Sequence, residues 1–401
     1  MKALIYDKTK GPWKDTQGFW LVDRPEPKLE SGDEEYVIVK MRYAGFCGSD
    51  RGIWSRSSFG ELILSTLEKE NREERIIGHE LLGEIVEMGD NVASKYDVKV
   101  GDVVSAESHI TCGVCYQCVR GDKHVCADDV IIGIAQDGCF AEYAKLPASI
   151  LWKTDTEKID PRIAAMQEPF GNAVHATTQV DMKDKTVAVF GCGAIGSMSI
   201  IVAKGMGAKK IIGIDVNKEN LKLAKEIGAD EVIQIGGSVE TQNIVSVQNA
   251  QNIASVQNRV KKPWESNEAA VQKIKELTNG IGVDVSLEMA GFNSSVNNAI
   301  QSVRRGGDVI LFGLKSGDFV VENFELMIRN GVNIHSVIGR QVWDTWEMTK
   351  KLLEDESNGI QEKLKKYVLK NYEGSVVKFQ DFDRDEFEKK MEQFPKLIFE
   401  F

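Results

Sequence analysis

The first part of the chain consists of short hydrophobic runs that alternate with polar residues and end at glycines. LLGEIVEMG (81–89), VGDVVSAES (100–108) and CFAEYAKLP (139–147) all show this pattern. Alternation with a period of two, bounded by turn-forming residues, is typical of β-strands with one buried face. We therefore expect residues 1–172 to form a mostly β domain.

From about residue 173 the pattern changes to strand-like runs that alternate with longer amphipathic segments. TVAVFG (186–191) has the pattern of a strand, AIGSMSIIVAKGMGA (194–208) that of a helix and KKIIGID (209–215) that of a second strand. The series continues in NKENLKLAKEIGA (217–229), DEVIQI (230–235), VDVSLEMAG (283–291), GGDVILFGL (306–314) and VNIHSVIG (332–339). This alternation predicts an α/β domain with a parallel, doubly wound sheet over residues 173–340. Residues 341–401 return to mixed elements, and we expect them to rejoin the first domain.

An insertion at about 236–265 interrupts the second domain. It contains two nearly identical nonapeptides, TQNIVSVQN (241–249) and AQNIASVQN (250–258). Two copies are too few for a solenoid, and loop insertions cost little stability. We interpret the duplication as a surface insertion and assign it no function.

The segment GCGAIG (191–196) fits the dinucleotide fingerprint G-x-G-x-x-G directly after a strand and at the start of a helix. Gly191 permits the tight turn, Gly193 lets the backbone approach a pyrophosphate, and Gly196 allows close packing of helix on strand. An acidic residue, Asp215, ends the next strand, where it would bind ribose hydroxyls and repel a 2′-phosphate. NAD is therefore favoured over NADP, in a Rossmann domain. The residues expected to bind the cofactor are Gly191, Gly193, Ala194, Ile195, Gly196 and Asp215.

Four of the seven cysteines lie within CGVCYQCVRGDKHVC (112–126), in a lobe that we place at 107–127. Clustered thiols of this kind favour metal ligation over disulfides. An iron–sulfur cluster is an alternative, but its usual last spacing is shorter, and tetrahedral zinc fits better. Four protein ligands leave no open position, so we expect a structural zinc site. Its ligands are Cys112, Cys115, Cys118 and Cys126.

A second set of possible ligands is dispersed along the chain. Cys47 stands in CGSDRGI (47–53), His79 and Glu80 stand in GHE (78–80), and Glu168 begins EPFGNAVH. Singly, each residue has an ordinary structural interpretation. Together a thiol, an imidazole and a carboxylate suit a catalytic zinc that keeps a fourth, open position.

In their order along the chain these motifs resemble those of the zinc-dependent medium-chain dehydrogenases, and among them the L-threonine 3-dehydrogenases most of all. HITCGVCYQC (109–118), GCFAEY (138–143), EPFGNAVH (168–175) and GRQVWDTW (339–346) carry the closer likeness. The resemblance implies a GroES-like catalytic domain built from residues 1–172 and 341–401, two zinc ions per chain and a homotetramer or homodimer.

The same resemblance implies the chemistry. The enzyme would transfer hydride from the secondary hydroxyl of a small polar substrate to NAD+. Cys47, His79 and Glu168 would hold the catalytic zinc, with Glu80 beside the metal and able to exchange onto it. Ser49 would be the first acceptor of the substrate's proton.

One segment departs from the threonine enzymes. Gly52 occupies the position at which they carry a histidine that passes the proton onward, so the proton would leave by another route. The stretch from CGSDRGI to LSTL (47–67) instead resembles glucose dehydrogenases. A polyol, sugar or sugar-acid substrate is therefore the alternative to threonine. Arg51 and Arg56 are candidates to pair with a substrate carboxylate, although arginines in such a loop are more often solvated.

Charge and hydropathy exclude other classes. The net charge of −11 argues against a nucleic-acid partner, and hence against a zinc ribbon. The longest apolar runs are far below the ~20 residues of a membrane span, and the first residues lack the apolar core of a secretory signal. We expect a cytoplasmic enzyme. A non-catalytic sensor of NAD is the alternative from another functional class.

Overall fold

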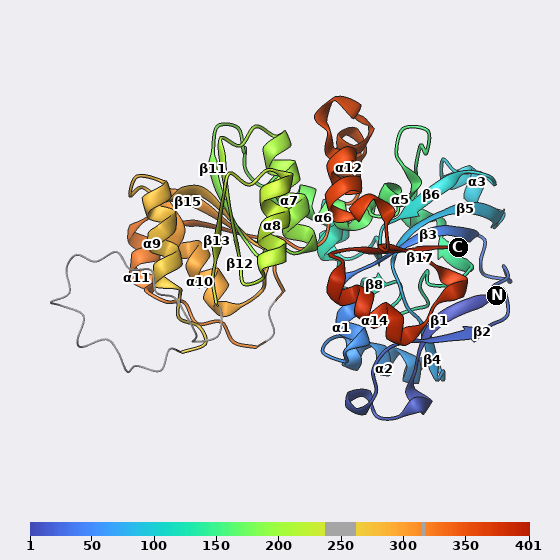
Figure 1. Ribbon diagram of the computed structural model, residues 1–401. Coiled ribbons are helices and arrows are strands. Elements are labelled where there is room, and N and C mark those ends of the chain that lie inside the picture. Colours follow the sequence, from blue (N-terminus) through green and yellow to red (C-terminus); the bar gives the residue numbers. More distant parts are fainter. Residues whose placement is uncertain (237–261, 315–316) are drawn as a thin grey trace. The chain divides into compact units, whose positions relative to one another are not determined.

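The computed structural model describes residues 1–236, 262–314 and 317–401 (Figure 1). The chain forms two compact units, one of Met1–His175 with Ile338–Phe401 and one of Ala176–Val337. The duplicated segment 241–258 lies outside the described residues. Among the helices that are described, none is long and apolar enough to cross a membrane.

The first unit is mostly β, as predicted. Its main sheet has the strand order β10-β6-β5-β3-β18-β17, and β9 also pairs with β3. These strands are β3 (Tyr36–Phe46), β5 (Glu80–Met88), β6 (Val103–Ala106), β9 (Tyr143–Pro147), β10 (Leu151–Lys153), β17 (Val376–Lys378) and β18 (Leu397–Glu400). A smaller sheet contains β1 (Lys2–Asp7), β2 (Trp20–Asp23) and β4 (Glu74–Ile76), and β7 (His109–Ile110) pairs with β8 (Val130–Ile131).

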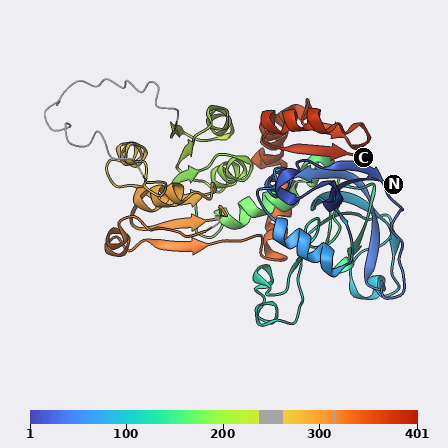
Figure 2. The ribbon, with the colours of Figure 1, turned by 90° about the horizontal axis from the view of Figure 1, so that it is seen from below.

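The C-terminal segment completes this sheet, because β18 runs antiparallel to β3 with Leu397 opposite Phe46. In Figure 2 the last elements, in red, lie beside the N-terminal strands, in blue. An aromatic cluster packs around the end of β3, where the ring of Phe46 lies 5.9 Å from Phe140 and 4.9 Å from Phe387. This packed end of β3 gives the following residue, Cys47, a rigid support.

The helices of the first unit cover the sheet and connect its strands. They are α1 (Gly48–Trp54), α2 (Gly60–Lys69), α3 (Val92–Lys95), α4 (Tyr116–Arg120), α5 (Pro161–Ala164), α6 (Gln167–Thr177), α12 (Asp344–Glu354), α13 (Ile360–Lys363) and α14 (Arg384–Gln393).

The second unit contains the parallel, doubly wound sheet that the sequence predicts, with strand order β13-β12-β11-β14-β15-β16. Its strands are β11 (Thr186–Phe190), β12 (Lys210–Asp215), β13 (Glu231–Gln234), β14 (Val283–Glu288), β15 (Val303–Leu311) and β16 (Asn333–Ser336). Its helices are α7 (Ala194–Gly205), α8 (Lys218–Ile227), α9 (Glu268–Leu277), α10 (Asn293–Ser302) and α11 (Phe324–Arg329). The strand order reverses between β11 and β14, and ligands of such sheets bind at the carboxyl ends of the strands at this point.

Candidate active site

Cys47 lies at the junction of β3 and α1, where it is the N-cap residue of the helix. Its backbone N–H donates to the Asp50 carboxylate at 2.8 Å, and its sulfur accepts from the backbone N–H of Asp50. This reciprocal arrangement is a capping box, which fixes the direction in which the helix leaves the strand. The thiol is therefore held by local structure that the sequence CGSD specifies.

His79 lies directly before β5 and faces α1. Its Nε2 is 3.3 Å from the hydroxyl of Ser49, and its Nδ1 is 3.6 Å from the Asp50 carboxylate. Burial acts to lower the pKa of His79, but the negative charges of Asp50 and Cys47 outweigh burial and raise this pKa to about 10. For the carboxyl group of Asp50 burial acts in the opposite direction and is the main cause that raises its pKa to about 6. The surroundings of the ring thus carry an excess of negative charge.

Glu80 is fully buried at the first position of β5, and one of its carboxylate oxygens forms an ion pair with Lys396. Lys396 is itself buried and donates to the carbonyl oxygen of Phe46 at 3.1 Å. Gly45, opposite Glu80 in the sheet, leaves the room for this carboxylate, since a Cβ atom there would lie 2.0 Å from Oε2. The other oxygen, Oε1, is buried without a hydrogen-bond partner in the described chain.

Glu168 lies in the first turn of α6 and is likewise buried. Its Oε1 forms an ion pair with Arg340 at 2.7 Å and accepts a hydrogen bond from Ser108 at 2.8 Å. Its Oε2 is buried and finds no hydrogen-bond partner among the described residues. Arg340 also pairs with Glu107, and a Cβ atom at Gly171 would come within 2.7 Å of its side chain.

The ligand atoms of Cys47, His79 and Glu80 lie within 4.8 Å of one another, so the structure brings these three predicted residues together. Glu168 is not in that group, and its charge faces Arg340. Two buried carboxylate oxygens without a partner beside a thiol and an imidazole are a donor set that suits Zn²⁺. Sequence and geometry thus fit a metal at Cys47, His79 and Glu80, and the charge of Glu168 acts on His79 from outside this group.

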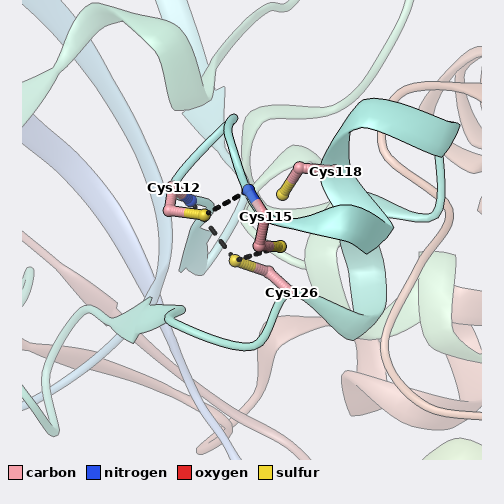
Figure 3. Close-up of side chains that lie close together, drawn as sticks. All are labelled: Cys112, Cys115, Cys118 and Cys126. Atoms are coloured by element: carbon pink, nitrogen blue, oxygen red, sulfur yellow. Dashed lines mark hydrogen bonds between the residues drawn. The ribbon is translucent and has the colours of Figure 1, made fainter.

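The cysteine lobe forms a second possible metal site. The sulfur atoms of Cys112, Cys115, Cys118 and Cys126 lie within 4.8 Å of one another and converge from a turn and α4 (Figure 3). The backbone N–H groups of Cys115 and Cys112 donate to the sulfurs of Cys112 and Cys126, each at 3.3 Å. Hydrogen bonds from the backbone of Ala127 and Cys118 lower the pKa of Cys115 to about 6. Four thiols of this kind suit tetrahedral zinc.

The glycine fingerprint joins β11 to α7 in the second unit. Gly191 has a φ of +88°, which favours glycine, and a Cβ atom at Gly196 would lie 1.9 Å from the carbonyl oxygen of Gly191. A Cβ atom at Gly193 would meet nothing within 4 Å, so the backbone is open on that side. Gly193 is the N-cap residue of α7, and Ala194 and Ile195 begin the helix. The N-terminus of such a helix can bind a phosphate.

Asp215, the predicted ribose-binding acid, ends β12 and is mostly buried. Its carboxylate accepts the backbone N–H groups of Cys192 at 2.7 Å and Asn217 at 2.8 Å, and the side-chain amide of Asn220 at 3.2 Å. The acid therefore ties the fingerprint turn to the end of the neighbouring strand, with lone pairs left over for a hydroxyl.

The two arginines considered as partners of a substrate carboxylate lie within α1 (Arg51) and directly after it (Arg56). Arg56 is buried against the rings of Tyr6, Trp13 and Trp20, and its guanidinium donates to backbone carbonyls and to Thr16. Arg51 donates to the carbonyl oxygens of Met391 and Phe394. Both guanidinium groups thus have partners within the first unit, and their pairing with a substrate carboxylate stays a prediction.

Sequence reasoning missed three charged residues of this site. Asp50 was visible within CGSD, and its spacing of three from Cys47 is the signal of a capping box. Arg340 stands in a segment that carried the family likeness, without a role attached. Lys396 has no signal, because a single lysine before a strand resembles any solvated lysine.

Comparisons with known proteins show the family of the chain. Residues 33–156 match the family described as "Alcohol dehydrogenase GroES-like domain", and residues 194–355 match "Zinc-binding dehydrogenase". The chain is 32% identical to the L-threonine 3-dehydrogenase of Bacillus licheniformis over 354 residues, which are 88% of each chain. It is 34% identical to that of Pyrococcus furiosus over 353 residues, also 88% of each. The structure of an alcohol dehydrogenase from Thermus sp. ATN1 superposes with a TM-score of 0.76 at 21% identity, covering 100% of this chain and 99% of the other. The chain therefore belongs to the zinc-binding dehydrogenases with a GroES-like domain, NAD-linked oxidoreductases that act on CH–OH donors.

Proposed function

We propose that this enzyme oxidises the secondary hydroxyl of a small polar substrate of the L-threonine type, at a centre formed by Cys47, His79 and Glu168 with Glu80 beside it. The observation that carries the proposal is the convergence of a thiol and an imidazole on the buried carboxylate of Glu80, whose Oε1 has no partner among the described residues; Glu168 is a second buried carboxylate with one such oxygen. The alignment with threonine dehydrogenases, which covers 88% of the chain at 32% identity, supports the substrate class.

The division of charge supports the roles of the two carboxylates. Lys396 neutralises one oxygen of Glu80 and Arg340 neutralises one oxygen of Glu168. Each carboxylate is thereby oriented, and its remaining oxygen, Oε1 of Glu80 or Oε2 of Glu168, is available to a metal. Zinc held by these residues would lower the pKa of a coordinated substrate hydroxyl, and bound NAD+ would be the hydride acceptor.

The residues of α1 then handle the proton. Asp50 faces Nδ1 of His79, which leaves Nε2 as the nitrogen for the metal. The hydroxyl of Ser49 lies 3.3 Å from that nitrogen, in position to accept the proton of a substrate hydroxyl bound beside it. Because Asp50 also accepts from the backbone of Cys47, one carboxylate orients both the thiol and the ring.

We further propose that the cysteine lobe binds a structural zinc, so that the chain holds two zinc ions. Four thiols held by backbone N–H groups leave no position for substrate. Thiols kept free for a metal also support a cytoplasmic location, where disulfides are rare.

An exposed apolar face in the second unit supports a homodimer or homotetramer. The edge strand β16 exposes Ile334, and no residue of α11 is fully buried, although Met327 packs partly against the core of this unit. Phe324 and Ile328 of this helix are 59% and 61% exposed. Exposed apolar side chains near the edge strand of a sheet suit pairing with a second copy.

The segment formed by α1 and the residues directly after it favours a neutral polyol or sugar as the second candidate substrate. The guanidinium groups of Arg51 and Arg56, which could have met a substrate carboxylate, are engaged with backbone carbonyls.

The test is the appearance of NADH with L-threonine beside a panel of polyols, aldoses and hexonates. We expect turnover of threonine and its loss in Cys47→Ala, with the fold intact by circular dichroism. Turnover of a sugar or polyol alone would overturn the substrate class. NAD binding without turnover of any alcohol would favour a sensor. A zinc content of one ion per chain instead of two would remove one of the two metal sites.

A further inference from the structure

Arg51 connects α1 to the C-terminal end of α14, although the segments that it joins lie 340 residues apart in the chain. Its Nη1 donates to the carbonyl oxygen of Met391, and its Nη2 donates to that of Phe394 at 2.9 Å. Phe394 is the C-cap residue of α14. The last carbonyl groups of a helix lack partners within it, and the helix dipole favours a cation at this end. The guanidinium therefore fixes the place at which α14 ends.

A short and stiff connection leads from this contact to the partner of Glu80. Pro395 separates Phe394 from Lys396, and its ring fixes its own φ and restricts the preceding residue to extended conformations. Phe394 has such a conformation, with φ −113° and ψ 132°. On the other side of Lys396, β18 begins at once and pairs with β3. A displacement of Phe394 is therefore passed on to Lys396.

Lys396 in turn determines which oxygen of Glu80 stays available. Its ammonium group forms the ion pair with Oε2 of Glu80 and donates to the carbonyl oxygen of Phe46 at 3.1 Å. Oε1 is the oxygen that finds no hydrogen-bond partner in the described parts of the chain. A carboxylate that binds a metal depends on such a neighbour for its orientation. The position of the ammonium group thus sets the position of Oε1.

The other end of the Arg51 contact is the helix that follows the candidate thiol ligand. Cys47 is the N-cap residue of α1, and the hydroxyl of Ser49 lies 3.3 Å from Nε2 of His79. The ligand atoms of Cys47, His79 and Glu80 lie within 4.8 Å of one another. Arg51 therefore joins the segment that holds the thiol to the segment that holds the carboxylate, and these contacts close a ring around the three ligand atoms.

We propose that Arg51 is a positioning residue of the metal centre, which keeps the thiol of Cys47 and the carboxylate of Glu80 in register by holding the turn 394–396 against α1. This inference rests on the proposed function, which places a zinc ion at Cys47, His79 and Glu80. Loss of a residue that orients a metal ligand typically weakens metal binding about 10–100-fold. Because Arg51 acts through intervening segments, we expect the lower end of this range.

The test measures the affinity of both metal sites of the full-length protein for Zn²⁺, by competition with a chelator. Cys47→Ala and Cys112→Ala each remove one site and so assign the two affinities in wild type. Arg51→Met keeps most of the length of the side chain but removes its charge and its donors. We expect it to weaken zinc binding at Cys47 about tenfold and to leave the cysteine lobe unchanged. Arg51→Lys, a single point donor that reaches one carbonyl, should recover part of the loss.

The matched control is Lys390→Met, at the same end of α14. Lys390 donates to the carbonyl oxygen of Gly374 at 3.0 Å and lies over the ring of Phe394. Its removal takes a cation from the helix end but leaves the two carbonyl groups that Arg51 binds with their partner. We expect both zinc affinities to stay at their wild-type values in this variant, whatever its effect on Tm in calorimetry.

A wild-type affinity at Cys47 in Arg51→Met, with or without a lower Tm, would overturn the inference. Equal weakening of both sites would also overturn it, because it would assign the effect to general loss of stability. If Arg51→Met does not fold, Arg51→Lys decides, and an unchanged affinity at Cys47 would then refute the positioning role. A wild-type protein that binds one zinc ion, in the cysteine lobe alone, would contradict the proposed function itself.

Discussion

Replacing Lys396 by methionine would leave the carboxylate of Glu80 buried without a counter-charge. The two side chains are 2% and 0% exposed, and Lys396 also donates to the carbonyl oxygen of Phe46. Removal of one partner of a buried ion pair typically costs about 3–5 kcal/mol. Methionine fills most of the same apolar volume, so a cavity adds little. We expect Lys396→Met to lower the free energy of unfolding of the first unit by about 4 kcal/mol.

Thermal unfolding measured by calorimetry, with zinc present in every sample, tests this magnitude. In a unit of this size each kcal/mol shifts Tm by roughly 2–4 °C, so the expected loss is about 10 °C. The matched control is Lys389→Met on α14, where both the lysine and its partner Glu386 are 63% exposed. That surface pair should contribute less than about 1 kcal/mol.

The double variant Glu80→Gln/Lys396→Met separates charge from packing. Because it removes both charges, it should recover most of the stability that Lys396→Met loses. A single variant within about 1 kcal/mol of wild type would refute the view that the buried ion pair with Lys396 stabilises the position of Glu80. A double variant as unstable as the single one would assign the loss to packing around β18.

Four further changes have expected outcomes. Gly196→Ala places a Cβ atom 1.9 Å from the carbonyl of Gly191, so the Kd of NADH in a fluorescence titration should rise at least about tenfold. Burial acts to raise the pKa of Glu107, but Arg340 and Trp346 outweigh it and hold this pKa below its ordinary value of 4.5. The ionised Glu107 therefore stabilises the folded state fully at pH 7, and this contribution is lost as the pH falls below 4.5. In urea unfolding, the difference in free energy of unfolding between wild type and Glu107→Gln should become smaller below that pH. Cys112→Ala should reduce the zinc content by one ion and lower Tm, as measured by metal analysis and calorimetry. Gly52→His should cost little stability in a calorimetric scan, because the atom that its Cβ would meet at 2.0 Å is the rotatable hydroxyl oxygen of Ser58.

Local patterns predicted the strands of the second unit well where each strand is buried on both faces. TVAVFG became β11 and KKIIGID became β12. The run GGDVILFGL was less accurate, since β15 begins at Val303. Val303 pairs with Val283, and Arg304 pairs with Asp284 beyond the two glycines. Two arginines and two glycines do not have the composition of a strand. Here they extend β15 because of their pairing with β14, which the local sequence does not reveal.

The ligand types of the site were predictable, but the charges that hold them were not. Cysteine and histidine are rare here, and their motifs limit the alternatives. The roles of Lys396 and Arg340 depend on pairing between segments more than 170 residues apart in the chain. Only after β18 has paired with β3 does Lys396 lie beneath Glu80, and no local pattern encodes that contact.

The residues after α1 differ from those of the threonine enzymes together with Gly52, which stands where those enzymes carry a histidine. Ser57 and Ser58 donate their backbone N–H groups to the carbonyl oxygen of Gly52, and a Cβ atom on Gly52 would lie 2.0 Å from the hydroxyl oxygen of Ser58. Arg56 holds this loop by its contacts with three aromatic rings. The missing histidine, the serines and the buried arginine are therefore parts of one structural change. We therefore expect the identity of the substrate to depend on the whole segment 51–59 rather than on Gly52 alone, since the Ser58 hydroxyl can rotate away from a side chain at position 52.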